Sequence, residues 1–345
     1  MKTPKHVLVV RLSALGDVAM TVPVIRALVK KHPDVKITFV SKPFLKPLFD
    51  NVENINFYAA EVNGKHKGFL GLYNLFVELS KLKIDAVADL HNVLRSKILR
   101  FFFHLTFTRV RFINKGRTEK KAITRSTNKE FKQLKTTHER YADVFRELGF
   151  EFEITNPEFP EKQNLSSDLI EITGEKDKKW IGIAPFAQYT TKMYPLELME
   201  KVIEELSKLH NVKILLFGGG KKEVEILSNL ENKFPNTINI AGKIKLKQEL
   251  DLISNLNVML SMDSGNAHFA AMLGIPTITV WGNTHPFIGF APFNQPIENA
   301  ILPDLEKYPL LPTSVYGNKI VEGYEEVTKS ISPKQIVDKI SELIN

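Results

Sequence analysis

The residues with the clearest chemical potential lie between Asn257 and Pro286. Asp263, Ser264 and Gly265 follow a short apolar run, and a helical pattern that contains His268 begins directly after them. Backbone N–H groups at the start of a helix are free, and together with the positive end of the helix dipole they bind phosphate well. A plain N-cap is the alternative, because many helices begin with the same residue types. The segment is therefore a candidate phosphate-binding site.

The elements around these residues form one strand–helix–strand pattern. Val258 to Met262 is a β-compatible run, Gly274 and Pro276 end the helix, and Thr277 to Trp281 is a second apolar run. The candidate residues thus lie at the carboxyl end of a strand. Open parallel sheets bind their ligands at this end.

A second candidate site follows the first apolar run of the chain. Val7 to Val10 predicts a buried strand, and a turn with Ser13, Gly16 and Asp17 leads into a helical pattern that ends at Lys31. Asp17 again lies at a strand end, although a first-turn aspartate that stabilises the helix dipole gives the same pattern. The turn lacks G-x-G-x-x-G, so a dinucleotide site is poorly supported.

Strands alternate with helices along both halves of the chain, which predicts an α/β protein with doubly wound parallel sheets. A length of 345 residues suggests two domains. We expect an N-terminal domain over residues 1–155, a linker over 156–179 with one short helix near Leu169, and a second domain over 180–330. Residues 331–345 predict a final helix, which begins at Ser332-Pro333.

Polar groups also follow other predicted strands. Asp89 and His91 come after the strand Ile84 to Ala88, where a turn that caps the next helix is an equally good interpretation. Three glycines at 218–220 end another strand. They allow a nucleotide to approach the backbone, and Glu223 could accept a hydrogen bond from a ribose hydroxyl. A tight strand-to-helix turn has nearly equal weight.

The composition narrows the class of protein. The chain has no cysteine, which excludes a disulfide framework, a thiolate nucleophile and a zinc–cysteine site, and fits a reducing cytosol. The first apolar run is too short for a signal peptide or a membrane span. A net charge of +8 points to an anionic partner: phosphate, nucleic acid or membrane lipid.

Four motifs together resemble glycosyltransferase family 9, the bacterial heptosyltransferases of lipopolysaccharide core assembly. They are R-L-S-A-L-G-D from Arg11, K-M-Y-P from Lys192, M-D-S-G-N-A-H from Met262 and W-G-N-T-H-P from Trp281. The resemblance covers residues 11–286 in the family's order. It implies a GT-B fold, in which two Rossmann-like domains face each other across a cleft, and a final helix that crosses back to the first domain.

The resemblance also implies a reaction. The family performs an inverting transfer that needs neither metal nor cofactor, from a nucleotide sugar, usually ADP-heptose, to a lipopolysaccharide core or related lipid-linked glycan. Asp17 resembles the family's catalytic base. We expect the donor phosphates and nucleotide to be held by Thr190, Thr191, Lys192, Gly218, Gly219, Glu223, Asp263, Ser264, Gly265 and His268. We expect the acceptor to be held by Ser13, Gly16, Asp89, His91 and Arg95.

The chain departs from the family at several positions. The loop before Lys192 has Ala187 and Gln188 where small hydroxyl residues are expected, and Thr190 and Thr191 could substitute for them. Asn266 and Asn283 stand where proline is common, and His285 where aspartate is common. These changes put the identity of the donor in doubt more than the fold.

The segment from Arg95 to Lys135 is strongly basic and contains Phe101, Phe102, Phe103 and Phe107. This composition suits a phosphorylated, lipid-anchored acceptor at the inner membrane leaflet, with a cytoplasmic enzyme in peripheral contact. Basic and aromatic residues would also suit nucleic acid, but no nucleic-acid module is recognisable and we expect no such partner. For most of these residues a structural interpretation is enough: the phenylalanines belong to the core, and the charged residues form a solvated face.

Three alternatives remain open beside the heptosyltransferase. The same scaffold could use a different nucleotide sugar. The altered loop before Lys192 keeps open an inactive sugar-nucleotide binder. A basic nucleic-acid-binding protein would show a steep dependence on salt, and replacement of Asp17 would not matter to it.

Overall fold

The computed structural model describes residues 3–344, and contacts divide the chain into two compact units. The first unit runs to Lys115 and resumes over Lys135–Glu158, and the second comprises Gly116–Leu134 and the chain from Phe159 onward. The boundary after Glu158 falls inside the expected linker. The outermost residues of the expected ranges, 1, 2 and 345, lie outside the described residues.

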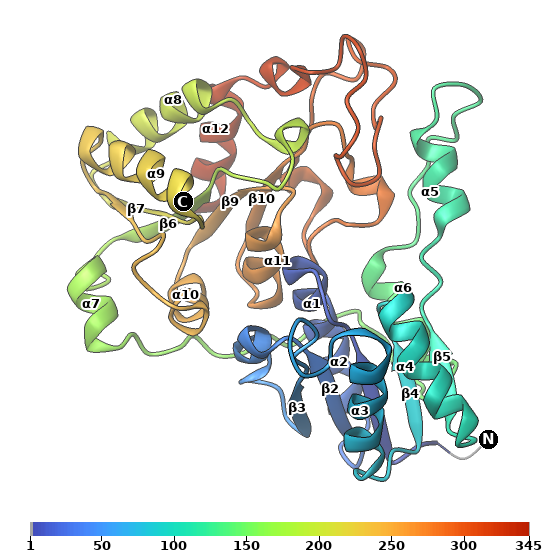
Figure 1. Ribbon diagram of the computed structural model, residues 1–345. Helices are drawn as coiled ribbons and strands as arrows, with labels where there is room; N and C mark the ends of the chain where they lie inside the picture. The colour runs from blue at the N-terminus through green and yellow to red at the C-terminus, as the bar shows by residue number, and fades with distance from the viewer. Residues whose placement is uncertain (1–2, 345) are drawn as a thin grey trace. The chain divides into compact units, whose positions relative to one another are not determined.

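The first unit contains a parallel five-stranded sheet with the order β3-β2-β1-β4-β5 (Figure 1). Its strands are β1 (His6–Val10), β2 (Lys36–Ser41), β3 (Ile55–Ala59), β4 (Ala86–Asp89) and β5 (Arg109–Phe112). Its helices are α1 (Leu15–Ala19), α2 (Thr21–Lys31), the 3-10 helix η1 (Pro43–Phe49), α3 (Gly68–Ser80), α4 (Leu94–Leu105) and α6 (Thr137–Arg146). The order reverses between β1 and β4, which makes their carboxyl ends the topological switch point.

Buried apolar runs explain these elements. Every residue of β1 and β4 is buried, as expected for strands covered by helices on both faces. The helices α3 and α4 pack together on the sheet and contribute Leu72, Leu75 and Leu99 to the core. The strand β5 has no counterpart among the strands that the sequence predicts, since Arg109 and Arg111 within it hide its pattern.

The second unit contains a parallel six-stranded sheet with the order β11-β10-β9-β6-β7-β8. Its strands are β6 (Lys179–Ala184), β7 (Val212–Leu216), β8 (Thr237–Asn239), β9 (Val258–Met262), β10 (Thr277–Val280) and β11 (Ala300–Ile301). Its α-helices are α5 (Arg117–Thr124), α7 (Ser167–Thr173), α8 (Leu196–Ser207), α9 (Lys221–Lys233), α10 (Leu246–Ile253), α11 (Gly265–Met272) and α12 (Pro333–Ile344). Its 3-10 helices are η2 (Thr190–Lys192), η3 (Pro286–Ile288), η4 (Ile297–Asn299) and η5 (Val327–Ser330). Here the switch point lies between β9 and β6.

The final helix α12 packs beside α8 in the second unit (Figure 1). Its stripe of Ile336, Ile340 and Ile344 is buried in the core of that unit. Full burial of an isoleucine is worth about 1.5–3 kcal/mol, so three of them hold the helix in place. The helix is thus part of the core of the second unit.

The excursion Gly116–Leu134, which carries α5, departs from the first unit and packs on the second. Ile123 and Leu134 bury themselves against Ile288, and the Lys120 ammonium lies 3.7 Å from the centre of the Phe290 ring. This segment lies within the expected range 1–155 in sequence, and its contacts assign it to the second unit. Local periodicity could not show this, because the partners lie more than 150 residues away in sequence.

Candidate functional site

Asp17 lies in the first turn of α1, directly after the β1 switch-point end. Its Oδ2 forms an ion pair of 2.6 Å with Arg11 Nη2 and accepts a hydrogen bond of 3.3 Å from the Ala14 N–H. The Asp17 side chain is 31% exposed, whereas Arg11 is buried. Asp17 therefore both caps its helix and presents a charged carboxylate to solvent, so the two interpretations of this residue are compatible.

Arg11 is a buried residue of this region for which the motif suggested no role. Its Nη1 donates to the Leu90 carbonyl at 2.8 Å, and its guanidinium lies 5.9 Å from the centre of the Tyr141 ring. The Tyr141 hydroxyl donates to the Asp17 carbonyl at 3.4 Å, and burial raises the pKa of this tyrosine. An arginine directly after an apolar strand and six residues before an aspartate is the sequence signal that could have revealed the pair.

His91 lies at the neighbouring switch-point end, after β4. Its Nδ1 accepts from the Leu12 N–H at 3.4 Å, and its Nε2 lies 3.5 Å from the Ser13 hydroxyl. Burial, with smaller contributions from Arg11 and Lys115, lowers the pKa of His91 to about 3. The imidazole is therefore neutral, and its place beside Ser13 brings two predicted acceptor residues together.

The other predicted acceptor residues differ in exposure. The Asp89 carboxylate is fully buried, where it accepts from the backbone N–H groups of His91 and Asn92 and pairs with Arg100 at 3.0 Å. This geometry favours the turn-forming interpretation of Asp89. Arg95 is exposed in the first turn of α4, and Gly16 lies within α1.

The Lys192–Asp263 pair occupies the switch point of the second unit. Lys192 ends η2, after β6, and its Nζ lies 2.8 Å from Asp263 Oδ2, after β9. The Thr284 hydroxyl donates to the same carboxylate oxygen at 2.8 Å. The side chain of Lys192 is 14% exposed and that of Asp263 is 8% exposed. The structure thus joins two predicted donor residues, and Thr284 is a third member that sequence reasoning missed.

Two glycines allow this arrangement. A Cβ at Gly282 would lie 2.1 Å from the Thr191 carbonyl oxygen, and a Cβ at Gly317 would lie 2.5 Å from the Lys192 side chain. The Thr191 hydroxyl donates to the Gly317 carbonyl, so its expected contact with phosphate has a competing partner. Thr190, in contrast, is exposed.

Ser264 and Gly265 begin α11 beside this pair. Ser264 has extended backbone geometry at the N-cap, and its hydroxyl lies 3.0 Å from the Ser261 hydroxyl and makes no capping bond. The free N–H groups expected at a helix start are thus left for another acceptor. His268, one turn later, is only 9% exposed.

Asn283 is a further residue of this region without a predicted role. Its N–H donates to the Thr191 carbonyl at 2.9 Å, and its own carbonyl accepts from Thr313 and Ser314. Its side chain is fully buried, and neither polar atom of its carboxamide has a hydrogen-bond partner among the described residues. The backbone of Asn283 therefore ties the Lys192 loop to the chain after β10.

The glycine turn after β7 is a tight strand-to-helix turn. Glu223 Oε2 accepts from the Gly219 N–H at 2.7 Å, which is the bond of a tight strand-to-helix turn. A Cβ at Gly218 would lie 3.0 Å from Leu227, while one at Gly219 would meet nothing within 4 Å. Gly219 is exposed, so the turn leaves its backbone open to a ligand.

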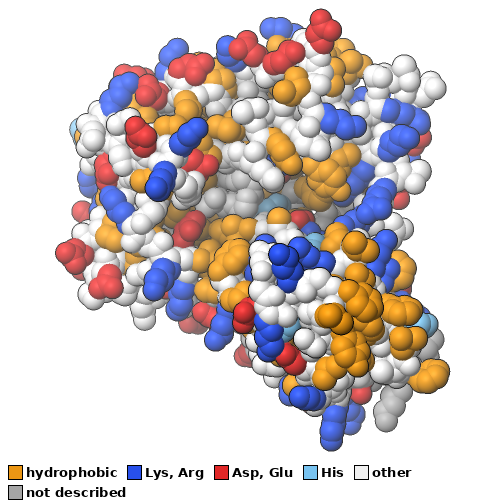
Figure 2. Space-filling view, viewed as in Figure 1, with side chains coloured by type: hydrophobic (Ala, Val, Ile, Leu, Met, Phe, Trp, Pro, Cys, Tyr) orange, Lys and Arg blue, Asp and Glu red, His pale blue; other side chains and the backbone are white. Residues whose placement is uncertain are grey.

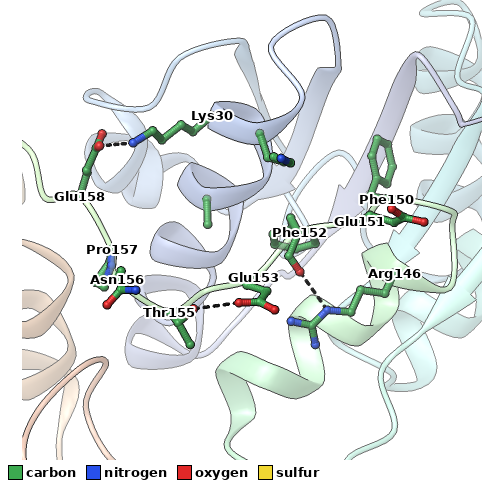
Figure 3. A pocket seen from close by; sticks show the side chains of 12 residues that line it. Lys30, Arg146, Phe150, Glu151, Phe152, Glu153, Thr155, Asn156, Pro157 and Glu158 are labelled. Carbon is green, nitrogen blue, oxygen red and sulfur yellow. Dashed lines mark hydrogen bonds and ion pairs between the residues drawn. The ribbon is translucent and has the colours of Figure 1, made fainter.

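A pocket of about 980 Å³ lies elsewhere in the first unit, between α2 and the chain after α6 (Figure 3). Two of its charged residues have partners: Lys30 pairs with Glu158, and Arg146 donates to the Phe152 carbonyl. None of the predicted site residues lines it. We therefore do not assign the reaction to this pocket.

Across residues 3–344, no three histidine or acidic side chains are grouped so that they could hold a metal ion. In the same part of the chain, no helix combines the length and the apolar character needed to cross a bilayer.

Comparisons with known proteins agree on one family. The model of glycosyltransferase family 9 (heptosyltransferase) matches residues 72–314. The lipopolysaccharide core heptosyltransferase OpsX of Haemophilus influenzae is 25% identical over 87% of this chain and 85% of its own length. The lipopolysaccharide heptosyltransferase 1 of Campylobacter coli is 28% identical over 80% of this chain and 83% of its own length.

Solved structures show the same fold. A family 9 glycosyltransferase from Veillonella parvula has a TM-score of 0.74 and 21% identity, covering 100% of this chain and 98% of its own. The Escherichia coli heptosyltransferase WaaC with ADP has a TM-score of 0.67 and 19% identity, covering 98% and 99%. The two parallel sheets with flanking helices are thus those of the GT-B fold.

Proposed function

Because the chain belongs to glycosyltransferase family 9, we propose that it transfers a heptose from ADP-heptose to a lipopolysaccharide core or related lipid-linked glycan. One observation carries this proposal: the family's motif residues occupy the switch points of both sheets. Asp17 lies at that point in the first unit, and Lys192 pairs with Asp263 at that point in the second. The names of the similar proteins support heptose as the sugar and ADP as the nucleotide.

In the proposed reaction, Asp17 acts as the base. Its ionised carboxylate accepts the proton of an acceptor hydroxyl, whose oxygen attacks the anomeric carbon as the bond to the diphosphate breaks. Attack from the face opposite the leaving group inverts the anomeric carbon. The ion pair with Arg11 supports this role, because it keeps the carboxylate charged and fixes its direction.

The departing diphosphate is the second requirement of the reaction. We assign its stabilisation to the Lys192 ammonium and the N–H groups at the start of α11, which carry positive charge or dipoles. These groups suffice for a transfer that needs no metal. A chelator is therefore expected to leave the rate unchanged, and strong inhibition by EDTA that Mg²⁺ reverses would contradict this part.

The acceptor is proposed to be anionic and anchored in the membrane. Support comes from the charges near His91, whose pKa is lowered mainly by burial and further by Arg11, Lys115 and Arg95. Of these cations, the exposed Arg95 can meet phosphate or carboxylate groups on an acceptor. We accordingly propose a cytoplasmic enzyme that works in peripheral contact with the inner membrane leaflet.

Titration calorimetry with ADP, UDP, GDP and CDP, without added metal, tests the donor assignment. We expect selective binding of ADP that is weakened at least about tenfold in Lys192→Ala, since a charge-assisted contact to phosphate is lost. Lys201→Ala, which changes an exposed lysine of α8, serves as the matched control. Selective binding of another nucleotide would retain the scaffold and reject ADP-heptose.

Two outcomes would favour the remaining alternatives. Selective ADP binding without any transfer activity would indicate an inactive sugar-nucleotide binder, as the residues Ala187 and Gln188 allow. Failure to bind all four nucleotides, together with salt-sensitive binding of DNA or RNA, would reject the enzyme and favour the nucleic-acid hypothesis.

A further inference from the structure

The first unit exposes a group of large apolar side chains on and after α3 and α4. We call it the α3–α4 patch, and it consists of Phe69, Leu70, Tyr73, Phe101, Leu105 and Phe107. Their exposed fractions run from 46% at Tyr73 to 99% at Phe107. Figure 2 shows hydrophobic side chains gathered over this part of the first unit. Large contiguous apolar patches on a protein surface mark interaction sites.

Three rings of the patch rest on one packed base. Phe102 is only 8% exposed, and its ring centre lies 5.4 Å from those of Phe69 and Tyr73 and 6.1 Å from that of Phe101. Leu105 lies one helical turn after Phe101 and therefore on the same face of α4. The exposed rings thus project from two helices that are fixed to each other.

The charge around the patch is positive. Lys67 immediately precedes α3, and Lys97 lies one turn before Phe101; both are exposed. Over residues 68–105, which include both helices, the sequence has three carboxylates: Glu78, Asp85 and Asp89. All three are engaged within the unit, and Glu78 pairs with Lys65. Asp85 accepts from the N–H groups of Lys5 and His6, and Asp89 pairs with Arg100.

We propose that the α3–α4 patch docks on a bilayer that contains anionic lipids. The phenylalanine and leucine side chains enter the boundary between headgroups and acyl chains, Tyr73 lies at the headgroups, and Lys67 and Lys97 meet lipid phosphates. The inference deepens the proposed function and rests on it in one respect, since a lipid-linked acceptor would bring the enzyme to a membrane.

A second copy of the chain fits the patch less well. A symmetric contact would bring Lys67 and Lys97 towards the same lysines of the other copy, and the centres of protein interfaces are depleted in lysine. An anionic bilayer neutralises these charges instead. Charge complementarity therefore selects the membrane as the occupant.

Flotation of the full chain with vesicles tests the proposal without donor or acceptor. The vesicles contain either phosphatidylcholine alone or phosphatidylcholine with phosphatidylglycerol. We expect binding to the anionic vesicles and a loss of about tenfold or more when Phe101→Ser and Phe107→Ser are combined, because two apolar side chains no longer leave water. Lys97→Glu should weaken binding to the anionic vesicles only. Phe44→Ser, at a phenylalanine of the same unit that is 57% exposed, is the matched control.

Three results would overturn the proposal. The first is that the wild type binds neither vesicle. The second is that the patch variant binds the anionic vesicles as well as the wild type does. The third is that light scattering shows a wild-type dimer and a monomeric patch variant, without any vesicle binding. Since the patch residues are exposed, circular dichroism should show that the variant folds. Nucleotide titration of the wild type and the variant separates the two proposals. If the wild type binds ADP normally but binds no vesicle, the patch proposal is rejected and the proposed function stands.

Discussion

Asp17 combines two properties at the scale of a single residue. Its carboxylate is fixed by the buried Arg11 and by the N–H of Ala14, yet almost a third of the side chain is exposed. These contacts restrict the conformations of the carboxylate, and its exposure allows the hydroxyl of an acceptor to reach it. Partial exposure beside a buried cation therefore suits a base better than a carboxylate that only stabilises a helix.

Replacement of this carboxylate should remove the reaction and spare donor binding. We expect Asp17→Asn to lower the transfer rate by about 10²–10⁴, the range that general-base catalysis contributes, with the ADP affinity unchanged in calorimetry. Asp50→Asn, at an exposed aspartate of the same unit, should keep full activity. Equal activity of Asp17→Asn and the wild type would show that the carboxylate serves the helix alone.

His91 makes the protein sensitive to acid. Its pKa is lowered by burial to about 3, whereas an unfolded chain has a histidine pKa near 6.5. Below a pH of about 6.5, the unfolded state therefore binds more protons than the folded state. The free energy of unfolding falls by about 1.4 kcal/mol per pH unit until His91 is protonated in the folded state as well. The same reasoning holds for His285, whose pKa burial lowers to about 4.

Urea unfolding at pH 7 and pH 5, followed by circular dichroism, measures this slope. We expect His91→Gln to lose less stability than the wild type over this interval, because glutamine does not titrate. His210→Gln, at an exposed histidine, should keep the wild-type slope. An unchanged slope in His91→Gln would refute the assignment.

At the scale of elements, the excursion Gly116–Leu134 depends on one lysine. Lys129 Nζ donates to the carbonyls of Ile123, Leu310 and Pro312 at 2.7, 2.9 and 2.8 Å. Burial lowers the pKa of Lys129 to about 8. The lysine therefore joins the excursion to the chain before the final helix of the second unit.

Loss of this lysine should release the excursion. A hydrogen bond to a charged group is worth about 1.5–3 kcal/mol, so we expect Lys129→Met to speed amide hydrogen exchange within residues 116–134 by about tenfold or more. Lys132→Met is the control, because Lys132 is largely exposed and pairs with Glu130 at the surface. Equal exchange in the two variants would show that Ile123 and Leu134 suffice to hold the segment.

At the scale of the whole molecule, each unit has its own sheet and core, and both tryptophans of the chain belong to the second. Trp180 and Trp281 are buried there, with exposed fractions of 0% and 1%. Tryptophan fluorescence therefore reports unfolding of the second unit. This unit also contains the predicted donor residues.

The donor nucleotide should accordingly stabilise the unit that fluorescence reports. At an ADP concentration of about a hundred times Kd, binding should raise the free energy of unfolding by about 2.7 kcal/mol. The fluorescence-detected Tm should rise accordingly. Asp17→Asn should retain this shift, and Lys192→Ala should lose it. A wild-type Tm that ADP leaves unchanged would contradict donor binding in the second unit.

The sequence by itself determined the α/β class, several strands of both sheets and the segments that carry Asp17, Lys192 and Asp263. These features are local: an apolar run that ends in cap and turn residues needs no distant partner to be recognised. The family resemblance rested on the same local motifs. The strand Arg109–Phe112 was not predicted, because its charged residues interrupt the apolar pattern.

The tertiary structure alone decided which of these residues meet. It paired Asp17 with Arg11, brought Thr284 to Asp263, buried the carboxylate of Asp89, and placed both the excursion Gly116–Leu134 and the helix Pro333–Ile344 on the second unit. Most of these outcomes depend on contacts between residues far apart in sequence. Such contacts depend on packing and on the need of buried polar groups for hydrogen-bond partners. The periodicity of apolar residues along the sequence contains no information about either.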